Sequence, residues 1–214
     1  MRKRSLAATA AALAVAGAGL VTVSILVMWS GQPSGDSLES DVFGYYATNA
    51  ARIRLGDVMW IAGLAALVAA AAISARRFAT VPRRVFVGGL AFCAALLSTS
   101  AAIAWFLAGD AAAGTVDSSF ERWALETHLF EAGAFLMFVP LFGAAAGIDR
   151  ERRFGNAMTA AGIVAGCSVV APIAPWNFLA AIAWIVGAVV FTVAPDLTRS
   201  GVRTAPAPHP VPAT

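Results

Sequence analysis

The residues of this sequence whose types and spacing could do chemistry are Glu126, His128 and Glu131, at the entry to a long apolar segment. An ionisable side chain inside a membrane costs about 2.5–3.5 kcal/mol on insertion scales, so it usually faces the protein interior or a water-filled pocket. On a helix, His128 and Glu131 share a face and can share a proton, whereas Glu126 points elsewhere. The spacing therefore predicts an acid–base site with Glu131 as the acid and His128 beside it.

Residues of other apolar segments are expected at the depth of Glu131. Counting along those segments places Asp57 and Ser98 on the same side of the membrane. The aromatic side chains expected below this polar layer are Trp60, Trp105, Phe130, Phe135 and Trp184. A pocket that is polar at its rim and aromatic below suits an amphiphilic or isoprenoid-like molecule. We therefore predict Glu131, His128 and Asp57 as catalytic residues, and these aromatic residues with Ser98 as substrate-binding residues.

A purely structural role for the same residues is an open alternative. Glu131 lies near the predicted membrane boundary, where its carboxylate can reach water or pair with Arg122 or Arg54. Serine and threonine side chains also commonly hold membrane helices together. The sequence alone does not decide between a functional pocket and ordinary helix packing.

Several classes of site are excluded by what the sequence lacks. It contains no glycine-rich phosphate loop, no Rossmann glycine pattern and no Asp-rich motif for magnesium and a diphosphate. Its two histidines, His128 and His209, are too few for a multi-histidine metal site or a bis-histidine haem site. Basic residues occur in short clusters between apolar segments, which argues against nucleic acid as a partner. We expect no metal and no cofactor, and proton chemistry is the class that remains.

The composition is that of a polytopic membrane protein with an all-α fold. Of the 214 residues 59% are hydrophobic and 13% are charged, against about 25% charged in soluble domains. Apolar segments of membrane-spanning length recur along the chain. They predict six transmembrane helices in one domain over residues 1–203, at about 6–29, 56–75, 85–108, 124–148, 154–171 and 176–193. Residues 204–214, with four prolines, are predicted to be a disordered tail.

Two helix starts carry their own signals. Asp57 stands at the predicted start of the second span, where its side chain can accept hydrogen bonds from free backbone N–H groups. Part of the preceding segment, 31–57, is expected to lie along the outer membrane interface as an amphipathic helix. Ser118 and Glu121 match a capping box, so the fourth helix is expected to begin there, before it enters the membrane.

The distribution of basic residues predicts the orientation. Lysine and arginine near span ends are retained on the cytoplasmic side. With the N-terminus inside, twelve of the fifteen basic residues fall on cytoplasmic segments, and only Arg52, Arg54 and Arg122 fall outside. We therefore expect a multi-pass protein of the cell membrane with both termini in the cytoplasm.

Small residues predict where two spans cross. Gly143 and Gly147 in the fourth span, and Gly162 and Gly166 in the fifth, have the Gly-x-x-x-Gly spacing that lets helix backbones approach closely. Because the two spans are consecutive, we expect these glycines to face each other.

The stretch from Tyr45 to Trp60, YYATNAARIRLGDVMW, followed by five more Ala/Leu/Val-rich spans, resembles a group of uncharacterised six-span membrane proteins of high-GC actinobacteria. That resemblance implies the six-span architecture and no activity. In size, span number and use of isolated membrane acids, the chain is also similar to small integral-membrane terpene cyclases. This more remote likeness implies proton-initiated isoprenoid cyclisation and matches no motif residue by residue.

Two functions follow as hypotheses. In the first, the protein binds or transforms a lipophilic small molecule in an outward-facing pocket, as a terpene cyclase does, with Glu131 as general acid. In the second, it is a non-enzymatic membrane subunit or a transporter accessory protein. The sequence predicts the lipid bilayer and such a small molecule as partners, and it indicates no protein partner.

Overall fold

The computed structural model describes residues 2–28, 31–33, 37–115, 119–149 and 174–198, and within these ranges every regular element is a helix. The all-α prediction is therefore confirmed for the described chain. In order, the elements are α1 (Arg2–Met28), α2 (Glu39–Ser74), the short 3₁₀ helix η1 (Ala75–Arg77), α3 (Thr80–Ala112), α4 (Ser119–Phe135), α5 (Phe138–Asp149) and α7 (Ala174–Thr198).

Five helical stretches of the described chain are long and apolar enough to cross a membrane. They are Arg4–Met28, Glu39–Arg77, Thr80–Ala112, Phe120–Ile148 and Phe178–Leu197. These five correspond to predicted spans one to four and six. The predicted fifth span, 154–171, and the tail, 204–214, lie outside the described residues, so the count of six spans stays a prediction.

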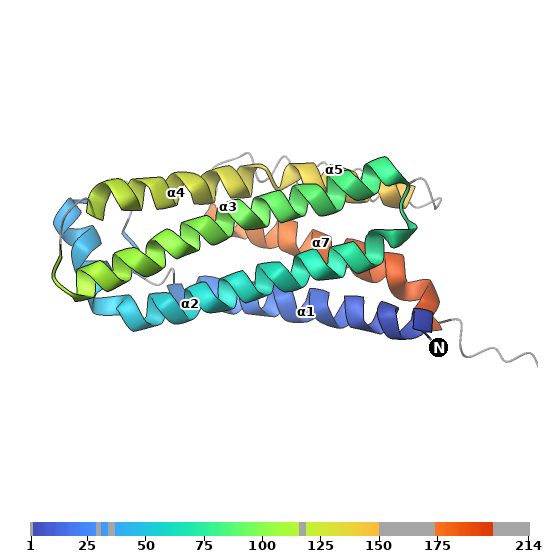
Figure 1. Cartoon of the computed structure of the whole chain (residues 1–214), viewed down its shortest axis with the longest axis horizontal. Coiled ribbons are helices and arrows are strands. Elements are labelled where there is room, and N and C mark those ends of the chain that lie inside the picture. Colours follow the sequence, from blue (N-terminus) through green and yellow to red (C-terminus); the bar gives the residue numbers. More distant parts are fainter. Residues whose placement is uncertain (1, 29–30, 34–36, 116–118, 150–173, 199–214) are drawn as a thin grey trace, which may run out of the picture.

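The helices form an elongated bundle in which chain neighbours lie side by side (Figure 1). α1 packs along α2, α2 along α3, and α3 along both α4 and α5, while α7 lies against α1. α1 begins at the same end of the bundle at which α7 ends (Figure 1). At that end, the Arg77 guanidinium donates to the Asp196 carboxylate and, over 3.2 Å, to the Thr192 carbonyl. These contacts join η1, which follows α2, to the end of α7.

The expected start of the second helix at Gly56 is wrong, and so is the capping role of Asp57. α2 is continuous from Glu39 to Ser74, 36 residues, which corresponds to a length of about 54 Å. Residues 39–57 therefore continue the axis of the span and form no separate interfacial helix. The physical reason is a buried face, because Val42, Tyr46 and Ile53 recur at helical spacing and pack against α3 and against Trp123 of α4.

The predicted fourth span is two helices, α4 and α5, that meet at Leu136 and Met137. The break has a local cause in Pro140, which lacks the N–H that would bond to the Leu136 carbonyl. The Val139 N–H donates to that carbonyl instead, over 3.0 Å. As predicted, α4 begins at the capping-box sequence, with Ser119 as its first residue.

Glycines permit two close helix crossings. A Cβ placed on Gly17 would lie 2.7 Å from the Gly63 carbonyl oxygen, and a Cβ on Gly63 would lie 2.8 Å from that of Gly17, so α1 and α2 nearly touch there. A Cβ on Gly143 would overlap the α3 backbone at Phe86. Gly143 therefore faces α3, while its predicted partner Gly162 lies outside the described residues.

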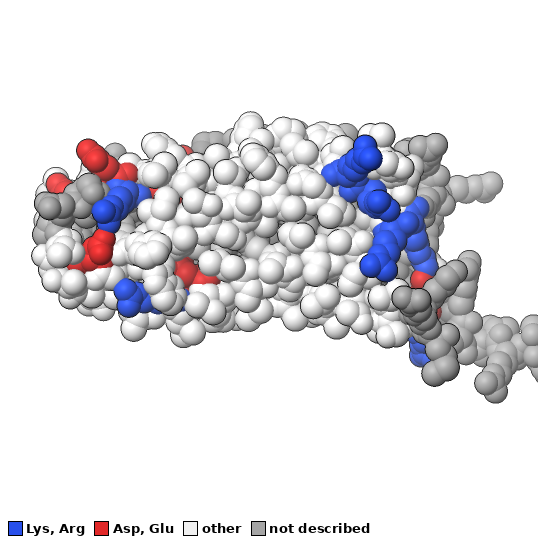
Figure 2. Space-filling view, viewed as in Figure 1, with Lys and Arg blue, Asp and Glu red and all other residues white. Residues whose placement is uncertain are grey.

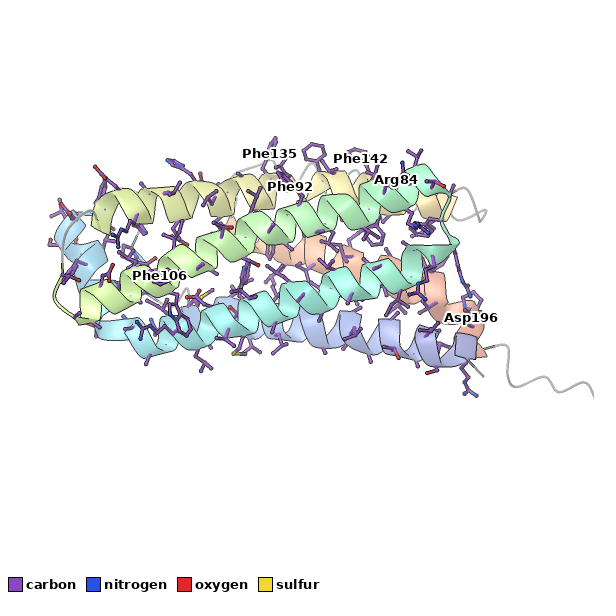
Figure 3. All side chains as sticks on the ribbon, viewed as in Figure 1. Arg84, Phe92, Phe106, Phe135, Phe142 and Asp196 are labelled. Carbon is purple, nitrogen blue, oxygen red and sulfur yellow. The ribbon has the colours of Figure 1, made fainter. Side chains whose placement is uncertain are left out.

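Charge divides the bundle along its long axis. On the face seen in Figure 2, arginines gather at the end where α1 begins, acids lie together with further basic residues toward the other end, and a broad uncharged band separates the two ends. Large aromatic side chains point outward from this band, among them Phe92, Phe106, Phe135 and Phe142 (Figure 3). An apolar outer surface of this kind suits a lipid environment.

Candidate functional site

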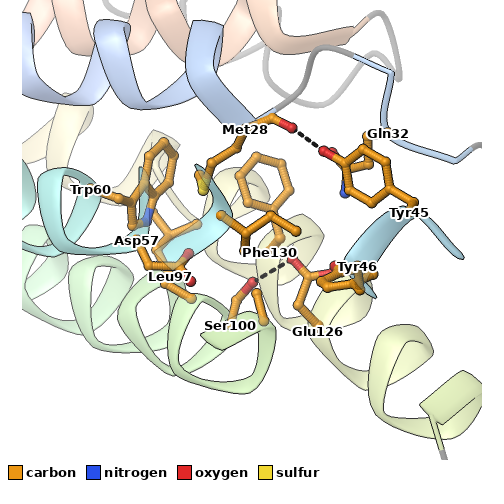
Figure 4. Close-up of a pocket in the computed structure, with 13 residues that line it drawn as sticks. Met28, Gln32, Tyr45, Tyr46, Asp57, Trp60, Leu97, Ser100, Glu126 and Phe130 are labelled. Carbon is orange, nitrogen blue, oxygen red and sulfur yellow. Dashed lines mark hydrogen bonds between the residues drawn. The ribbon is translucent and has the colours of Figure 1, made fainter. Parts of the chain in front are cut away.

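A small polar cavity lies where α2, α3 and α4 meet, toward the acid-bearing end of the bundle. We call it the acid cavity; its volume is about 30 Å³ and it is lined by Met28, Gln32, Tyr45, Tyr46, Ile53, Asp57, Trp60, Leu97, Ser100, Ala101, Ala104, Glu126 and Phe130 (Figure 4). Because one water needs about 10–15 Å³ of such space, the acid cavity has room for about two water molecules.

Asp57 is a buried acid of this cavity. Its side chain, in the middle of α2, is 1% exposed. Among the described residues, neither of its carboxyl oxygens has a hydrogen-bond partner. Burying a polar group without a partner costs about 1–3 kcal/mol as judged from protein variants, and an isolated ionised carboxylate costs far more. Such a group needs a bound proton, a water or both.

Glu126 of α4 faces the same cavity from the opposite side (Figure 4). Its Oε1 accepts a hydrogen bond of 3.2 Å from the buried Ser100 hydroxyl of α3. Tyr46 of α2 lines the same cavity next to Glu126 (Figure 4). Within the described chain, Oε2 is buried without a partner. Asp57 and Glu126 thus line the same cavity, and we call them the carboxyl pair.

Helical spacing explains why these residues converge. Tyr46, Ile53, Asp57 and Trp60 fall on one face of α2, and Leu97, Ser100, Ala101 and Ala104 fall on one face of α3. On α4, Glu126 and Phe130 are four residues apart and therefore point the same way. The acid cavity lies between the main core of the bundle, which includes Trp60 and Leu97, and a smaller core, which includes Tyr46 and Ala104.

An aromatic cluster lies next to the carboxyl pair. The Trp60 ring stacks on Phe178 of α7 at a centroid distance of 5.2 Å, and Phe130 lies 6.0 Å from Trp60 and 6.1 Å from Phe178. Carboxyl groups and the rings of Trp60 and Phe130 thus line the same cavity. Aromatic faces attract cations, so these rings suit a neighbouring positive charge.

The end of α1 is tied to α2 at the level of the cavity. The Tyr45 hydroxyl donates to the Met28 carbonyl (Figure 4), and the Arg52 guanidinium lies 5.9 Å from the centre of the Tyr45 ring. The Ser24 hydroxyl donates over 2.8 Å to the Gly56 carbonyl, the residue before Asp57. These contacts hold α1 against the part of α2 that carries the acid.

The structure brings three of the nine predicted site residues into this cavity, namely Asp57, Trp60 and Phe130. The other aromatic candidates lie apart from it. Trp105 is partly exposed beneath the Arg54 guanidinium, at 5.3 Å, and Phe135 points outward against Phe138. Trp184 packs against the main core, and half-buried Ser98 is not a lining residue.

The sequence left open whether Glu131 is buried, and the structure places it on the outer face of α4. Glu131 is 67% exposed and His128 is 77% exposed, and the His128 Nδ1 lies 3.5 Å from the Glu131 Oε2 on the outer face of α4. They share a face as predicted, but that face points away from the acid cavity. Their catalytic role stays a prediction without support from the cavity.

The acid that sequence reasoning missed is Glu126. Glu126 and Glu131 are about 140° apart around the helix, so only one can face inward. A signal for the inward face was present, because Trp123, Glu126, Phe130 and Gly133 follow a spacing of three and four residues. Gly133 confirms that orientation, since a Cβ on it would lie 2.8 Å from the Leu97 side chain.

In the described ranges, no group of three or more His, Cys, Asp or Glu side chains is placed to hold a metal ion. Comparison with protein-family models, with curated proteins and with solved structures found no match to this chain.

Proposed function

We propose that this chain is an integral membrane protein that binds and exchanges a proton at the carboxyl pair of Asp57 and Glu126. The observation that supports this most directly is that three of the four oxygens of the pair are buried without a partner in the described chain. Two ionised carboxylates in one buried cavity are strongly disfavoured, whereas a pair that shares a proton is not. A proton also provides a hydrogen-bond donor for an otherwise unpaired oxygen.

The surroundings support transfer as well as binding of that proton. The acid cavity has room for about two waters, which can link Asp57 to Glu126. The Tyr46 and Ser100 hydroxyls, both next to Glu126, can each accept and donate a hydrogen bond. In our proposal they extend the proton path from the carboxyl pair toward the nearer end of the bundle.

The orientation that we propose puts this proton site on the outer side of the membrane. Five arginines lie at the end of the bundle opposite the acid cavity, where the start of α1, η1 and the start of α3 meet. They are Arg4 of α1, Arg76 and Arg77 of η1, and Arg83 and Arg84 of α3. Positive charges of this kind are retained in the cytoplasm. A reporter active only in the cytoplasm should therefore give signal when fused after Arg199 and none after Asp117, and a signal after Asp117 contradicts the orientation.

A second candidate function is general acid catalysis on a lipophilic molecule, of the kind that the likeness to membrane terpene cyclases implies. The cluster of Trp60, Phe130 and Phe178 favours it, because aromatic faces beside an acid can stabilise a carbocation. Glu126 then takes the role predicted for Glu131. This candidate ranks second because a cavity of about 30 Å³ admits water and no isoprenoid without rearrangement.

The infrared absorption of protonated carboxyl groups tests the first proposal. In nanodiscs, the wild-type protein should show a carboxylic acid band that shifts in D₂O and decreases as the pH rises. Glu126→Gln and Asp57→Asn should each remove or displace this band, because each leaves a single acid where two interacted. Glu131→Gln, on the exposed face of the same helix, is the matched control and should leave the band unchanged.

Two outcomes contradict the proposal. If neither Glu126→Gln nor Asp57→Asn alters the band, the protonated group lies elsewhere. If no band titrates in the folded protein, the two acids only pack helices, as the hypothesis of a non-enzymatic subunit predicts. The second candidate has its own readout, because solvent extraction of the purified protein followed by mass spectrometry should reveal a bound lipophilic compound that Trp60→Ala loses.

A further inference from the structure

A second and larger concavity lies at the other end of the bundle. We call it the arginine groove; it lies between the end of α2 and the start of α3, has a volume of about 560 Å³ and is lined by Ala72, Arg76, Arg83, Arg84, Val87 and Gly88. No residue of this groove belongs to the acid cavity. The inference below is therefore independent of the proposed proton site.

The lining carries three positive charges and no acid. The guanidinium groups of Arg76, Arg83 and Arg84 are exposed and make no ion pair with any described residue, in contrast to Arg77, which pairs with Asp196. Three cations around one groove attract an anion. The guanidinium fork also matches the geometry of a phosphate group, to which it can donate two parallel hydrogen bonds.

Polarity changes along the groove in the direction of the membrane. Ala72 of α2 lies about one turn before Arg76 of η1, and Val87 and Gly88 lie one turn after Arg83 and Arg84 on α3. The arginines thus occupy the helix ends, and the apolar residues lie one turn deeper. A site that is cationic at the rim and apolar below matches a phospholipid, whose phosphate lies above its acyl chains.

Open space continues down α3 from this groove. A Cβ placed on Gly88 would meet no atom within 4 Å. Phe92, one further turn along, is 58% exposed and lies on the outward side of the helix, as does Arg84 (Figure 3). Arg84, Gly88 and Phe92 therefore follow one another at intervals of four residues on one face, which provides a track for a lipid chain.

We propose that the arginine groove binds an anionic phospholipid, with its phosphate held by Arg76, Arg83 and Arg84. One acyl chain lies along Val87 and Gly88 toward Phe92. Basic pockets between membrane helices are suited to anionic headgroups. A free phosphate ion would use only the arginines, whereas the proposed lipid also needs the apolar half of the groove.

The test measures lipid binding by the full chain in detergent, by native mass spectrometry with phosphatidylglycerol and phosphatidylcholine as probes. The wild-type protein should retain phosphatidylglycerol preferentially. The double variant Arg83→Gln/Arg84→Gln should bind it about 30-fold more weakly, from the loss of two charges near the headgroup. Arg4→Gln, at the same end of the bundle but outside the groove, is the charge control and should bind as the wild type does.

Gly88→Leu separates the lipid from a free phosphate. The new side chain projects into open space, so the fold should be kept, but it occupies the track of the acyl chain without changing any charge. Phosphatidylglycerol binding should weaken severalfold, and inorganic phosphate should compete poorly. The proposal is overturned if phosphatidylglycerol and phosphatidylcholine bind equally, if Arg4→Gln weakens binding as much as the double variant, or if Gly88→Leu has no effect.

Discussion

The two ends of this bundle hold their ionisable side chains in opposite ways. In the acid cavity, Asp57 is 1% exposed and faces Glu126 across about 30 Å³. In the arginine groove, Arg76, Arg83 and Arg84 lie at the surface around about 560 Å³. Each site therefore gathers charges of one sign, but only the acids are buried.

The difference follows from the chemistry of the two groups. A carboxyl group can lose its charge by binding a proton, so a pair of acids can be buried at a moderate cost. A guanidinium group stays charged at any pH that a protein meets. Its charge must face water or an anion, and it is placed at the helix ends, where both are available. The acid end is thus suited to proton binding and the arginine end to binding anions.

The largest effect is expected from a change at the crossing of α1 and α2, between the two ends. Gly63→Leu forces α1 away from α2 at their crossing, because the added atoms meet the Gly17 carbonyl and the Val21 backbone. We expect a loss of about 3 kcal/mol in stability, since backbone atoms cannot yield as a flexible side chain does. Thermal unfolding in detergent measures it. Gly88→Leu is the control, and equal melting temperatures of the two variants would show that the crossing is not close.

Asp57→Leu is expected to stabilise the protein while it removes the proposed function. The replacement takes away a buried acid that has no hydrogen-bond partner in the described chain, and the adjacent cavity offers room for the larger side chain. Unfolding in denaturant should show a gain of about 1–3 kcal/mol, together with loss of the titrating carboxyl band. A clear loss of stability would mean that Asp57 has a partner that stabilises its charge.

Arg84→Glu is expected to leave stability nearly unchanged, because the side chain is exposed and makes no ion pair with the described residues. The change should stay within about 0.5 kcal/mol. Phosphatidylglycerol binding should nevertheless fall more than in Arg84→Gln, since the new charge repels the phosphate. If the charge reversal strongly destabilises the fold while lipid binding persists, Arg84 stabilises the fold and does not bind the lipid. The proposed difference in function between the two ends is then wrong.

The smallest effect is expected for Glu131→Gln. Its contact with His128, at 3.5 Å, lies on the exposed side of α4, and exposed ion pairs contribute about 0–1 kcal/mol. Melting temperature and carboxyl band should both match the wild type. A loss of the band in this variant, but not in Glu126→Gln, would restore the acid originally predicted from the sequence.

Much of the fold could be predicted because it depends on local properties of the chain. The spans containing α1, α3 and α7 were expected close to where they lie. The continuous α2 was missed because Gly56 and Asp57 look like a helix start, although nothing there prevents a helix from continuing. What continues it is the burial of Val42, Tyr46 and Ile53 against α3 and α4, which are distant in sequence.

The site was predicted only in part. The sequence predicts Asp57, Trp60 and Phe130 as site residues because each is polar or aromatic and lies at the expected depth in the membrane. All three line the acid cavity. Depth is readable from sequence because it follows from position along a span. Rotation about the helix axis is harder to read: the sequence favoured Glu131, whereas Glu126, about 140° away around α4, lines the acid cavity.

The sequence by itself determined that the chain is helical, that it has apolar spans, and that basic and acidic residues concentrate at opposite ends. These properties follow from composition and from position along each segment. Only the tertiary structure decided that Glu126 faces Asp57, that Gly143 faces α3, and that the arginines surround a groove. Each of these depends on how far a helix is rotated about its axis, and that rotation is set by side-chain packing between helices that are far apart in sequence.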